Sequence, residues 1–369
     1  IFMRILIITS NLTKGGSPIV IKNICPILME KHHITIMTND QKSLDIKCNK
    51  LIQLKSTDFP FIQYKYIPEL KKIVNQNKLK EFDIIHIFDY PHFGADYLTY
   101  KKNKIGIPMV LSTHGSVHQF SKFPLSIFKK IHNSIMSKYT DRISQFLAIT
   151  EAEKNHLIQN NILEKQIKIV HLGVNSSHIE HKESSEKIIL YLGRLSKTKN
   201  VEILVQAFSK INDKNVKLVL AGPDFGMKKD LEKIIRKQGI GNRVIFTGEI
   251  SEEQKNEYFS KSTIFVHPSL EDIFSLALIE AAAAGIPTIA FDVEGNSEIL
   301  EDGITGKLVK NPTQESLKES IELLLNNKEL RVKISQNART MIPEKFNWKN
   351  TTKSFEKIYI DCINEDKKL

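Results

Sequence analysis

The sequence predicts an α/β protein of two doubly wound domains that face each other across a cleft. Its 369 residues correspond to two or three domains, since one domain usually takes about 100–200 residues. The chain is 41% hydrophobic and 26% charged, which is ordinary for a folded globular protein and excludes a disordered or fibrous chain. Short apolar runs alternate with helix-like periodic segments along almost the whole length, a pattern typical of parallel sheets covered by helices.

The predicted strands are short apolar runs flanked by Gly, Pro, Asn or Asp. They are residues 4–9, 34–38, 84–88, 109–112, 146–150 and 167–171 in the first half, and 188–192, 216–221, 244–247, 264–267 and 288–291 in the second. Residues 176–187 lack an apolar run and are the best linker candidate. We therefore expect an N-terminal domain at 1–178, a C-terminal domain at 187–345, and a final helix within 346–369.

Simpler features exclude several other classes of protein. No stretch of about 18 or more residues lacks both charges and helix breakers, so no membrane-spanning helix is expected. The opening apolar run is only one strand long, so no secretory signal is expected. Cys25, Cys48 and Cys362 are far apart and form no CxxC pair, so we expect reduced thiols in a cytoplasmic protein. No HExxH motif or cluster of Asp and His predicts a metal site.

The net positive charge is concentrated in the first half of the chain. Residues 1–180 carry 24 − 14 = +10, whereas residues 181–369 carry 29 − 28 = +1. Such asymmetry predicts an anionic partner for the first half, either a membrane surface, a nucleic acid or a phosphorylated acceptor. A Lys-rich composition without any partner would explain the asymmetry equally well.

Two segments of the first half follow predicted strands with residues suited to a ligand. Gly15-Gly16 follows the first strand, with Ser17 as the expected N-cap and Pro18 as the first helical residue, so an anion could approach the backbone there. His114 follows another strand and could hydrogen-bond a hydroxyl or stabilise developing charge. The alternatives are a plain strand-to-helix turn and a structural histidine.

A third segment places two cations after a strand of the second half. Arg194 and Lys199 lie between the predicted strand 188–192 and a helix, directly after Gly193. A fork-shaped guanidinium and an ammonium at the carboxyl end of a strand suit a diphosphate. Open α/β sheets bind their ligands at this edge. Two solvated loop charges are the alternative.

The sharpest signal is the segment 268–287. An acidic loop with Asp272 leads into a helix that is apolar except for Glu280. Burying Glu280 is costly unless hydrogen-bond donors satisfy it, and a ribose diol is one candidate. The amides of residues 273–276 open the helix and can receive a phosphate or a sugar hydroxyl. Alternatively, Glu280 pairs with a buried Arg or Lys, and Asp272 merely caps the helix.

Together these segments resemble glycosyltransferase family 4, the group 1 glycosyltransferases of GT-B fold. The resemblance covers essentially the whole chain. The matching segments are, in order, Gly15-Gly16, His114-Gly115, 171–175, 193–199, 221–224, 244–249 and 268–287. The resemblance implies two Rossmann-like domains, an N-terminal one that binds the acceptor and a C-terminal one that binds the nucleotide-sugar. It also implies that the final helix crosses back toward the N-terminal domain.

The resemblance assigns a role to each matched residue. Arg194 and Lys199 would hold the donor diphosphate, while His114 would lie against the sugar near its reacting carbon. These three and Asp272 would form the catalytic set. The donor-binding residues would be Gly15, Gly16, Gly193, Gly222, Gly248, Glu249, Ile273, Phe274, Ser275, Leu276 and Glu280. The chain departs from the family pattern where Asp272 replaces a glutamate, and where Ile273 and Ser275 replace glycines and would narrow the sugar pocket.

The implied activity is a retaining transfer of a hexosyl or N-acetylhexosaminyl group from a UDP-, GDP- or ADP-sugar. The acceptor would be a glycan or a lipid-linked molecule in the synthesis of a cell-surface polysaccharide or glycolipid. The nucleotide-sugar is a co-substrate, so no cofactor is expected, and no metal, because the two cations would do its work. The basic amphipathic stretch 120–142 predicts peripheral contact with the anionic inner face of the cell membrane; a core helix with solvated lysines is the alternative.

Other classes of function stay open on the residues alone. A non-hydrolysing sugar-nucleotide epimerase or an NAD oxidoreductase would share the architecture, although the sequence lacks GxGxxG. A non-catalytic binding module would fit the basic half, but no nucleic-acid motif supports it, so no nucleic-acid partner is expected.

Overall fold

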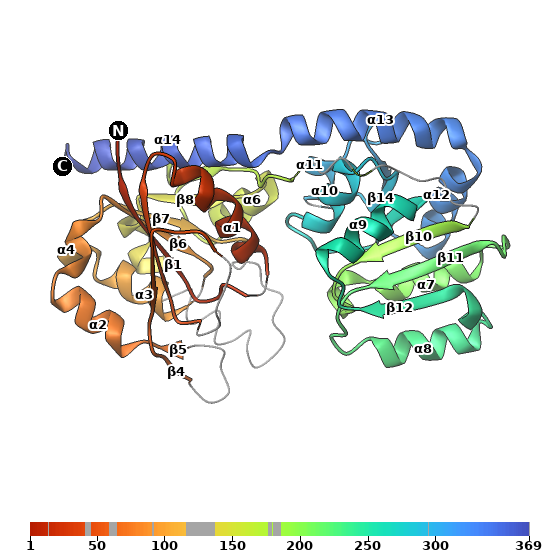
Figure 1. The fold of residues 1–369 in the computed structure, drawn as a ribbon, viewed down its shortest axis with the longest axis horizontal. Helices are drawn as coiled ribbons and strands as arrows, with labels where there is room; N and C mark the ends of the chain where they lie inside the picture. The colour runs from red at the N-terminus through yellow and green to blue at the C-terminus, as the bar shows by residue number, and fades with distance from the viewer. Residues whose placement is uncertain are drawn as a thin grey trace. The chain divides into compact units, whose positions relative to one another are not determined.

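The computed structural model describes residues 1–13, 15–40, 46–58, 65–90, 92–115, 137–175, 179, 186–293 and 295–368. The chain divides into two compact units (Figure 1). Ile1–Gly173 and Trp348–Leu369 form the first unit, and Val174–Asn347 form the second. Each unit has its own parallel sheet and its own apolar core.

The first unit contains a seven-stranded parallel sheet. Its strands are β1 (Arg4–Thr9), β2 (His33–Thr38), β3 (Lys50–Gln53), β6 (Ile84–Phe88), β7 (Met109–Ser112), β8 (Gln145–Ala148) and β9 (Ile167–Ile169). They are ordered β3-β2-β1-β6-β7-β8-β9. The sequence does not predict β3, because this edge strand is mostly exposed and lacks an apolar run. A short antiparallel pair, β4 (Thr57–Asp58) and β5 (Lys65–Tyr66), lies outside this sheet.

The helices of the first unit include the last helix of the chain. They are α1 (Gly16–Leu28), α2 (Pro68–Asn75), α3 (Phe93–Tyr100), α4 (Lys102–Ile105), α6 (Glu151–Gln159) and α14 (Trp348–Asp366), with 3-10 helices η1 (Lys78–Glu81), η2 (Ser137–Arg142) and η3 (Glu164–Gln166). The helix α14 packs against α1. Its buried Tyr359 hydroxyl is hydrogen-bonded to Nδ1 of His86 at 2.6 Å, and Nε2 of His86 meets the Ser112 hydroxyl at 2.8 Å. The C-terminal helix is therefore part of the core of the first unit.

The second unit contains a six-stranded parallel sheet. Its strands are β10 (Lys187–Leu192), β11 (Val216–Ala221), β12 (Val244–Gly248), β13 (Ile264–His267), β14 (Thr288–Phe291) and β15 (Lys307–Val309), ordered β12-β11-β10-β13-β14-β15. Its helices are α7 (Val201–Ser209), α8 (Lys228–Lys237), α9 (Glu252–Lys261), α10 (Leu276–Ala283), α11 (Asn296–Ile299), α12 (Gln314–Asn326) and α13 (Lys328–Lys345), with η4 (Lys197–Lys199) and η5 (Gly241–Arg243). The sequence does not predict β15, which has only three residues.

Both sheets have a topological switch point. The chain winds outward in one direction from β1 and in the other from β6, and β10 and β13 play the same parts in the second sheet. Loops on either side of such a point diverge, which leaves an open crevice at the carboxyl ends of the two strands. The fold therefore places one ligand-accessible edge on each unit.

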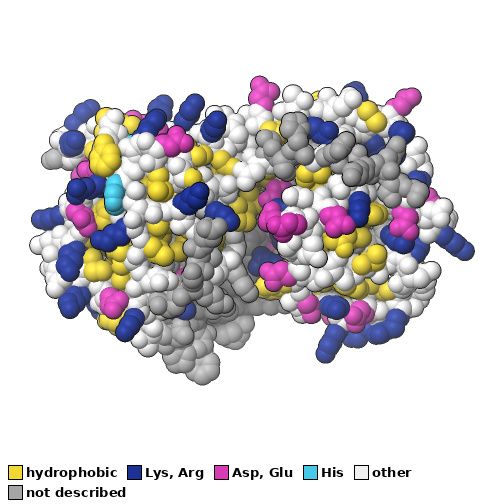
Figure 2. Space-filling view, in the orientation of Figure 1, with side chains coloured by type: hydrophobic (Ala, Val, Ile, Leu, Met, Phe, Trp, Pro, Cys, Tyr) yellow, Lys and Arg dark blue, Asp and Glu magenta, His cyan; other side chains and the backbone are white. Residues whose placement is uncertain are grey.

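Charge is distributed unevenly over the surface. In the view of Figure 2, Lys and Arg side chains are spread over both units, while Asp and Glu side chains gather mainly on the second. Of the stretch 120–142, predicted to contact a membrane, only residues 137–142 are described, and they form η2. Most of the predicted linker 176–187 likewise lies outside the described residues. Among the helices that are described, none has both the length and the apolar character to cross a membrane.

Candidate functional site

Three neighbouring strands of the second unit end on glycine at the carboxyl edge of the sheet. Gly193 follows β10, Gly222 follows β11, and Gly248 ends β12. The Gly222 N–H donates to the Gly248 carbonyl at 2.8 Å. Gly222 has a φ of 134°, and a Cβ at this position would lie 2.1 Å from the Gly193 carbonyl oxygen. Only glycine fits this close approach, so the edge presents bare backbone to a ligand.

The loop after β10 holds Arg194 on a fixed backbone. The hydroxyl of buried Tyr191 donates to the Arg194 carbonyl at 2.8 Å. The Leu195 N–H donates to the Pro223 carbonyl at 2.9 Å, and the Phe225 N–H donates to the Leu195 carbonyl at 3.0 Å. These hydrogen bonds join the loops that follow β10 and β11.

The Arg194 side chain is exposed and available to an anion. Its guanidinium carbon lies 5.3 Å from the centroid of the Phe225 ring. Within the described part of the chain, no carboxylate pairs with it. A guanidinium without a carboxylate partner, at the carboxyl edge of a switch-point strand, is well placed to receive a phosphate.

Lys199 lies in the same loop, but its ammonium is paired in the free protein. Its Nζ contacts Oδ2 of Asp272, and the same oxygen lies 2.8 Å from Nε2 of buried His267. Burial alone would raise the pKa of Asp272, but the hydrogen bond from His267 and the charge of Lys199 outweigh it and hold that pKa well below its usual range. Burial lowers the pKa of His267. Asp272 is therefore an ionised group that neutralises Lys199.

The helix α10 is capped by a serine. The Ser275 hydroxyl accepts a hydrogen bond from the Leu278 N–H at 3.3 Å, and Leu276 begins the helix. The alternative interpretation of Asp272 as the helix cap is therefore wrong, because the Asp272 carboxylate turns to Lys199 and His267 instead.

The loop before α10 is fixed by the backbone that precedes α11. Ile273 and Phe274 are buried. The Gly295 N–H donates to the Asp272 carbonyl at 3.3 Å, and a Cβ at Gly295 would lie 1.7 Å from the Ile273 carbonyl oxygen. This contact requires glycine at position 295 and holds the loop between Asp272 and the helix in one conformation.

Glu280, on α10, is ion-paired with a lysine of α9. Its side chain is 27% exposed, and its Oε2 lies 3.0 Å from Nζ of Lys255. Burial raises the pKa of Glu280, while the charge and hydrogen bond of Lys255 act in the opposite direction. The pairing with a lysine that the sequence left open is thus present. The other oxygen, Oε1, makes no hydrogen bond to a described residue, so an acceptor is left for a ligand.

The first unit carries a second set of residues at the ends of β1 and β6. Gly15 precedes α1 with a φ of 106°, and the helix begins at Gly16. The prediction that Ser17 caps this helix is wrong: Ser17 lies in the first turn, where its hydroxyl donates to the Asp89 carboxylate. Asp89 also accepts from the Thr9 hydroxyl at 2.9 Å. The Asp89 carboxylate, directly after β6, therefore binds the Ser17 hydroxyl inside the first turn of the helix.

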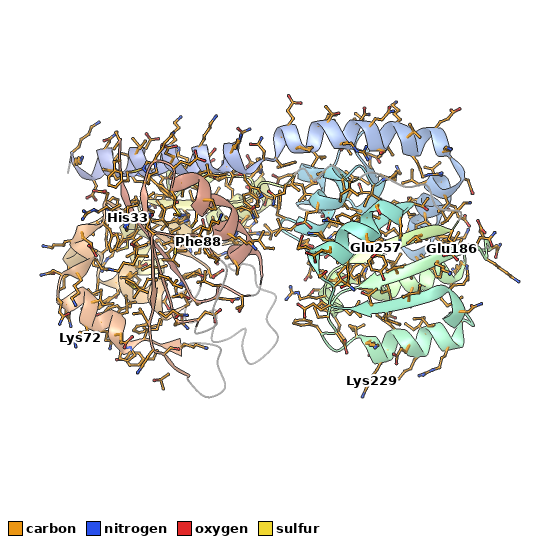
Figure 3. All side chains as sticks on the ribbon, viewed as in Figure 1. His33, Lys72, Phe88, Glu186, Lys229 and Glu257 are labelled. Atoms are coloured by element: carbon orange, nitrogen blue, oxygen red, sulfur yellow. The ribbon has the colours of Figure 1, made fainter. Side chains whose placement is uncertain are left out.

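His114 lies in a constrained turn directly after β7. Its φ is 47°, and its ring stacks on Phe88, labelled in Figure 3, with 5.5 Å between the centroids. The buried carboxylate of Glu153 accepts from the Thr113 hydroxyl at 2.6 Å and from the Ile149 N–H at 2.8 Å. Glu153 therefore holds the turn on which His114 sits.

One nitrogen of His114 has no partner among the residues that the structure describes. Its Nε2 is buried and makes no hydrogen bond to the residues that the structure describes. Burial lowers the pKa of His114, although the charges of Glu153 and Asp89 oppose this shift. His86, in contrast, uses both ring nitrogens. His114 is therefore a neutral imidazole with an unused nitrogen, which can hydrogen-bond a ligand hydroxyl.

The structure groups the predicted site residues by unit. The second unit brings the glycine-ended strands, Arg194, Lys199, Asp272 and the start of α10 to one edge, and Glu249 is exposed just beyond β12. Gly15, Gly16 and His114 belong to the first unit.

Sequence reasoning does not find four polar residues of these sites, which are Asp89, Glu153, Lys255 and His267. Asp89 could have been found from the sequence, because it directly follows a buried strand and so lies at the carboxyl edge of the sheet. Glu153 and Lys255 lie on helices rich in charged residues, where nothing in the pattern separates them from solvated neighbours. Asp89, Glu153 and Lys255 each bind a residue 25 or more positions away, at Ser17, Thr113 and Glu280, and only the fold reveals these pairs. The partner of His267 is the nearby Asp272, but the loop between them hides the contact in the sequence.

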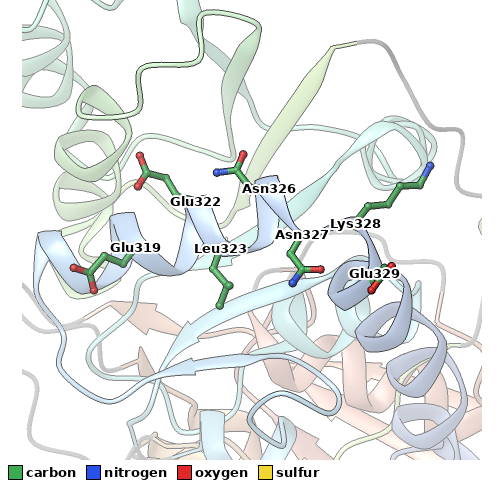
Figure 4. A pocket seen from close by; sticks show the side chains of 7 residues that line it. All are labelled: Glu319, Glu322, Leu323, Asn326, Asn327, Lys328 and Glu329. Atoms are coloured by element: carbon green, nitrogen blue, oxygen red, sulfur yellow. The ribbon is translucent and has the colours of Figure 1, made fainter.

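One surface hollow is lined by none of these site residues. A hollow of about 580 Å³ at the junction of α12 and α13 is lined by Glu319, Glu322, Leu323, Asn326, Asn327, Lys328 and Glu329 (Figure 4). Three of its seven lining residues are glutamates and one is a lysine, so its net negative charge does not suit a phosphate. In the part of the chain that the structure describes, no three His, Cys, Asp or Glu side chains are grouped so as to hold a metal ion.

Two doubly wound parallel sheets, each with polar residues at its switch point, define a GT-B architecture. Residues 14–178 match the family model for glycosyltransferase family 4, and residues 175–341 match that for group 1 glycosyl transferases. The chain belongs to the group 1 glycosyltransferases, and this confirms the family and the fold class expected from the sequence.

Individual relatives agree with this assignment. An uncharacterized glycosyltransferase of Methanocaldococcus jannaschii is 29% identical over 285 residues, which is 72% of this chain and 70% of the relative. The alpha-D-kanosaminyltransferase of Streptomyces kanamyceticus is 26% identical over 275 residues, 69% of this chain and 70% of that enzyme. HepE of Anabaena, solved in complex with UDP-glucose, has the same fold with a TM-score of 0.79 at 17% identity, over 96% of this chain and 98% of HepE.

Proposed function

We propose that this glycosyltransferase moves a hexosyl or N-acetylhexosaminyl group from a nucleotide-sugar to a glycan or lipid-linked acceptor, with retention of the anomeric configuration. The observation that carries the proposal is the exposed Arg194, without a carboxylate partner among the described residues, on the same loop as Lys199. HepE, of the same fold, was solved with UDP-glucose, and a kanosaminyltransferase is among the relatives. Both support a sugar attached to a nucleoside diphosphate as the donor.

The second unit would bind the donor. Arg194 would bind the diphosphate as a fork-shaped donor, and the bare backbone at Gly193 and Gly222 would allow the phosphates to approach closely. Lys199 would exchange Asp272 for a phosphate oxygen, and Asp272 would then accept hydrogen bonds from sugar hydroxyls. Glu280 would bind the ribose diol through its unused oxygen.

The chemical step needs charge neutralised as the leaving group departs. The bond between the anomeric carbon and the β-phosphate oxygen breaks, and its electron pair stays on the nucleoside diphosphate. The acceptor oxygen bonds to the same carbon and releases its proton to the phosphate oxygen that departs. Arg194 and Lys199 would stabilise the growing negative charge in place of a metal ion. His114 would hydrogen-bond a sugar hydroxyl through Nε2.

The proposal is tested by incubation with UDP-, GDP- and ADP-sugars in the presence and absence of oligosaccharide acceptors. We expect one donor to be consumed only when an acceptor is present, to give an α-linked product from an α-linked donor by NMR. Addition of EDTA should leave the rate unchanged. A sugar altered in the absence of acceptor would instead indicate an epimerase, and no turnover of any donor would contradict the proposal.

We also propose that the basic first part of the chain contacts an anionic acceptor or the inner face of a membrane. Its support is the charge of +10 on residues 1–180. Sedimentation with liposomes measures this directly. Binding should increase with the fraction of anionic lipid and decrease with salt; equal binding to neutral and anionic vesicles would remove the idea.

A further inference from the structure

Lys255 lies between two carboxylates on the second unit. Its Nζ is 3.0 Å from Oε2 of Glu280 on α10 and 2.7 Å from Oε2 of Glu252, one turn earlier on α9. The side chain of Lys255 is only 14% exposed, whereas that of Glu252 is 79% exposed. The pair that Lys255 makes with Glu280 is thus the covered one, and the pair with Glu252 is open to water.

This geometry constrains Glu280 more than a surface ion pair would. Glu280 is the one charged residue of α10, whose other members are Leu, Ala and Ile. A carboxylate in such surroundings favours its protonated form unless a cation is held against it. Lys255 supplies that cation and occupies Oε2, while Oε1 has no partner within the described residues.

We propose that Lys255 is a positioning residue for nucleotide binding, which keeps Glu280 ionised, ties Oε2 to α9 and leaves Oε1 to accept a hydrogen bond from a ribose hydroxyl. This inference rests on the proposed function, which assigns the ribose to Glu280. Lys255 need not touch the nucleotide, because it acts through the charge and orientation of its neighbour.

The inference leads to a pH dependence. Among the described groups, the charges that act on Glu280 are those of Lys255, which lowers its pKa, and Glu252, which raises it. When Lys255 is replaced by Met, only burial and Glu252 act, and both raise the pKa of Glu280. Its carboxylate should then be protonated at a higher pH than in the wild-type protein, and ribose binding should weaken as the pH falls.

Calorimetric titration with UDP, GDP and ADP, each with its 2′-deoxy counterpart, tests the inference. At pH 6, Lys255→Met should weaken binding of the preferred ribonucleotide about tenfold, or about 1.4 kcal/mol, with a smaller loss at pH 8. The 2′-deoxy nucleotide should lose less, because its missing hydroxyl already removes part of the contact. Lys255→Arg should restore most of the affinity.

The matched control is Lys261→Met. Lys261 also lies on α9 and pairs with a carboxylate, that of Glu257 (labelled in Figure 3), but this pair is exposed and is not among the charges that shift the pKa of Glu280. This variant should bind as the wild type does. If Lys255→Met keeps the wild-type ratio of ribo- to deoxyribonucleotide affinity at both pH values, the inference is overturned while nucleotide binding stands. If the wild-type protein binds none of the nucleotides, the proposed function falls and the inference falls with it.

Discussion

At the scale of single residues, the two cations of the second unit differ in their state. Arg194 is exposed and has no carboxylate partner among the described residues. Lys199, in contrast, is paired with Asp272, whose carboxylate is also hydrogen-bonded to His267. A ligand phosphate can bind Arg194 at once but must displace Asp272 from Lys199. We therefore expect Arg194 to govern the first contact with the donor, and Lys199 to contribute fully only once the sugar is in place.

Arg194→Ala should lower kcat/KM for sugar transfer about 100-fold, because one preorganised donor to the leaving group is lost. Lys197→Ala is the control, since Lys197 is an exposed lysine of the same loop. Steady-state kinetics measures the effect, and thermal unfolding should show unchanged stability. A loss of stability with unchanged kinetics would mean that Arg194 has a structural role only.

The buried histidines make stability depend on pH. Burial lowers the pKa of His86, His114 and His267 below the value of about 6.5 that each has in the unfolded chain. Below that pH the unfolded state binds more protons than the folded state. The free energy of unfolding should therefore be highest above about pH 6.5 as far as these histidines determine it, and should fall as the pH decreases. Urea unfolding at pH 7.5 and 5.5 measures this. Equal or greater stability at pH 5.5 would contradict the assignment of these rings as neutral.

The sequence predicts the candidate site better than it predicts the contacts within it. The order of Gly193, Arg194, Lys199 and Glu280 along the chain was sufficient to place them at one strand edge or on the following helix. It could not show that Glu280 meets Lys255, because that depends on how α9 packs beside α10. The cap at Ser17 was predicted wrongly for a similar reason, since Asp89 lies 72 residues away in sequence.

At the scale of elements, the edge of the second sheet depends on close contact between two strand ends. A Cβ at Gly222 would lie 2.1 Å from backbone that no side-chain rotation can move. Gly222→Ala should therefore separate the ends of β10 and β11 and abolish nucleotide binding.

Gly226→Ala is the matched control, because Gly226 also has a positive φ, of 92°, but nothing lies within 4 Å of its added Cβ. This variant should lose only about 1 kcal/mol of folding stability, from backbone strain. Its affinity for the nucleotide should be unchanged. Calorimetric titration and thermal unfolding compare the two. Similar behaviour of the two variants would show that the close contact is not required.

Most of the strands that the sequence predicts are buried, although β9 and β12 are partly exposed. The central runs, such as Ile84–Phe88 and Ile264–His267, are buried along their whole length and stand out as apolar segments. The edge strands β3 and β15 escape prediction because one is exposed and polar and the other is three residues long. The missed strands lie at the edges, far from the switch points, so the location of the site could be predicted without them.

At the scale of the whole molecule, the chain returns to its first unit after completing the second. The helix α14 supplies Tyr359, which is fully buried and hydrogen-bonded to His86 in the first sheet. The first unit therefore needs the last residues of the chain to satisfy its core.

Tyr359→Phe should leave Nδ1 of His86 without its partner and destabilise the first unit by about 1–3 kcal/mol. Denaturant unfolding measures this loss. In the double variant Tyr359→Phe with His86→Leu, the loss should be smaller than the sum of the two single losses, because the unpaired nitrogen is absent. Strict additivity would contradict a direct coupling between α14 and the first sheet.

The central claim is that the carboxyl edge of the second sheet holds a nucleoside diphosphate through Arg194. The most direct test is calorimetric titration of wild type and Arg194→Ala with UDP and UMP, or with the GDP or ADP pair if that base binds more tightly. The diphosphate should lose about tenfold or more in affinity on Arg194→Ala, as expected for a charge-assisted hydrogen bond, while the monophosphate should lose little. An equal loss for both nucleotides, or no loss for either, would contradict the claim.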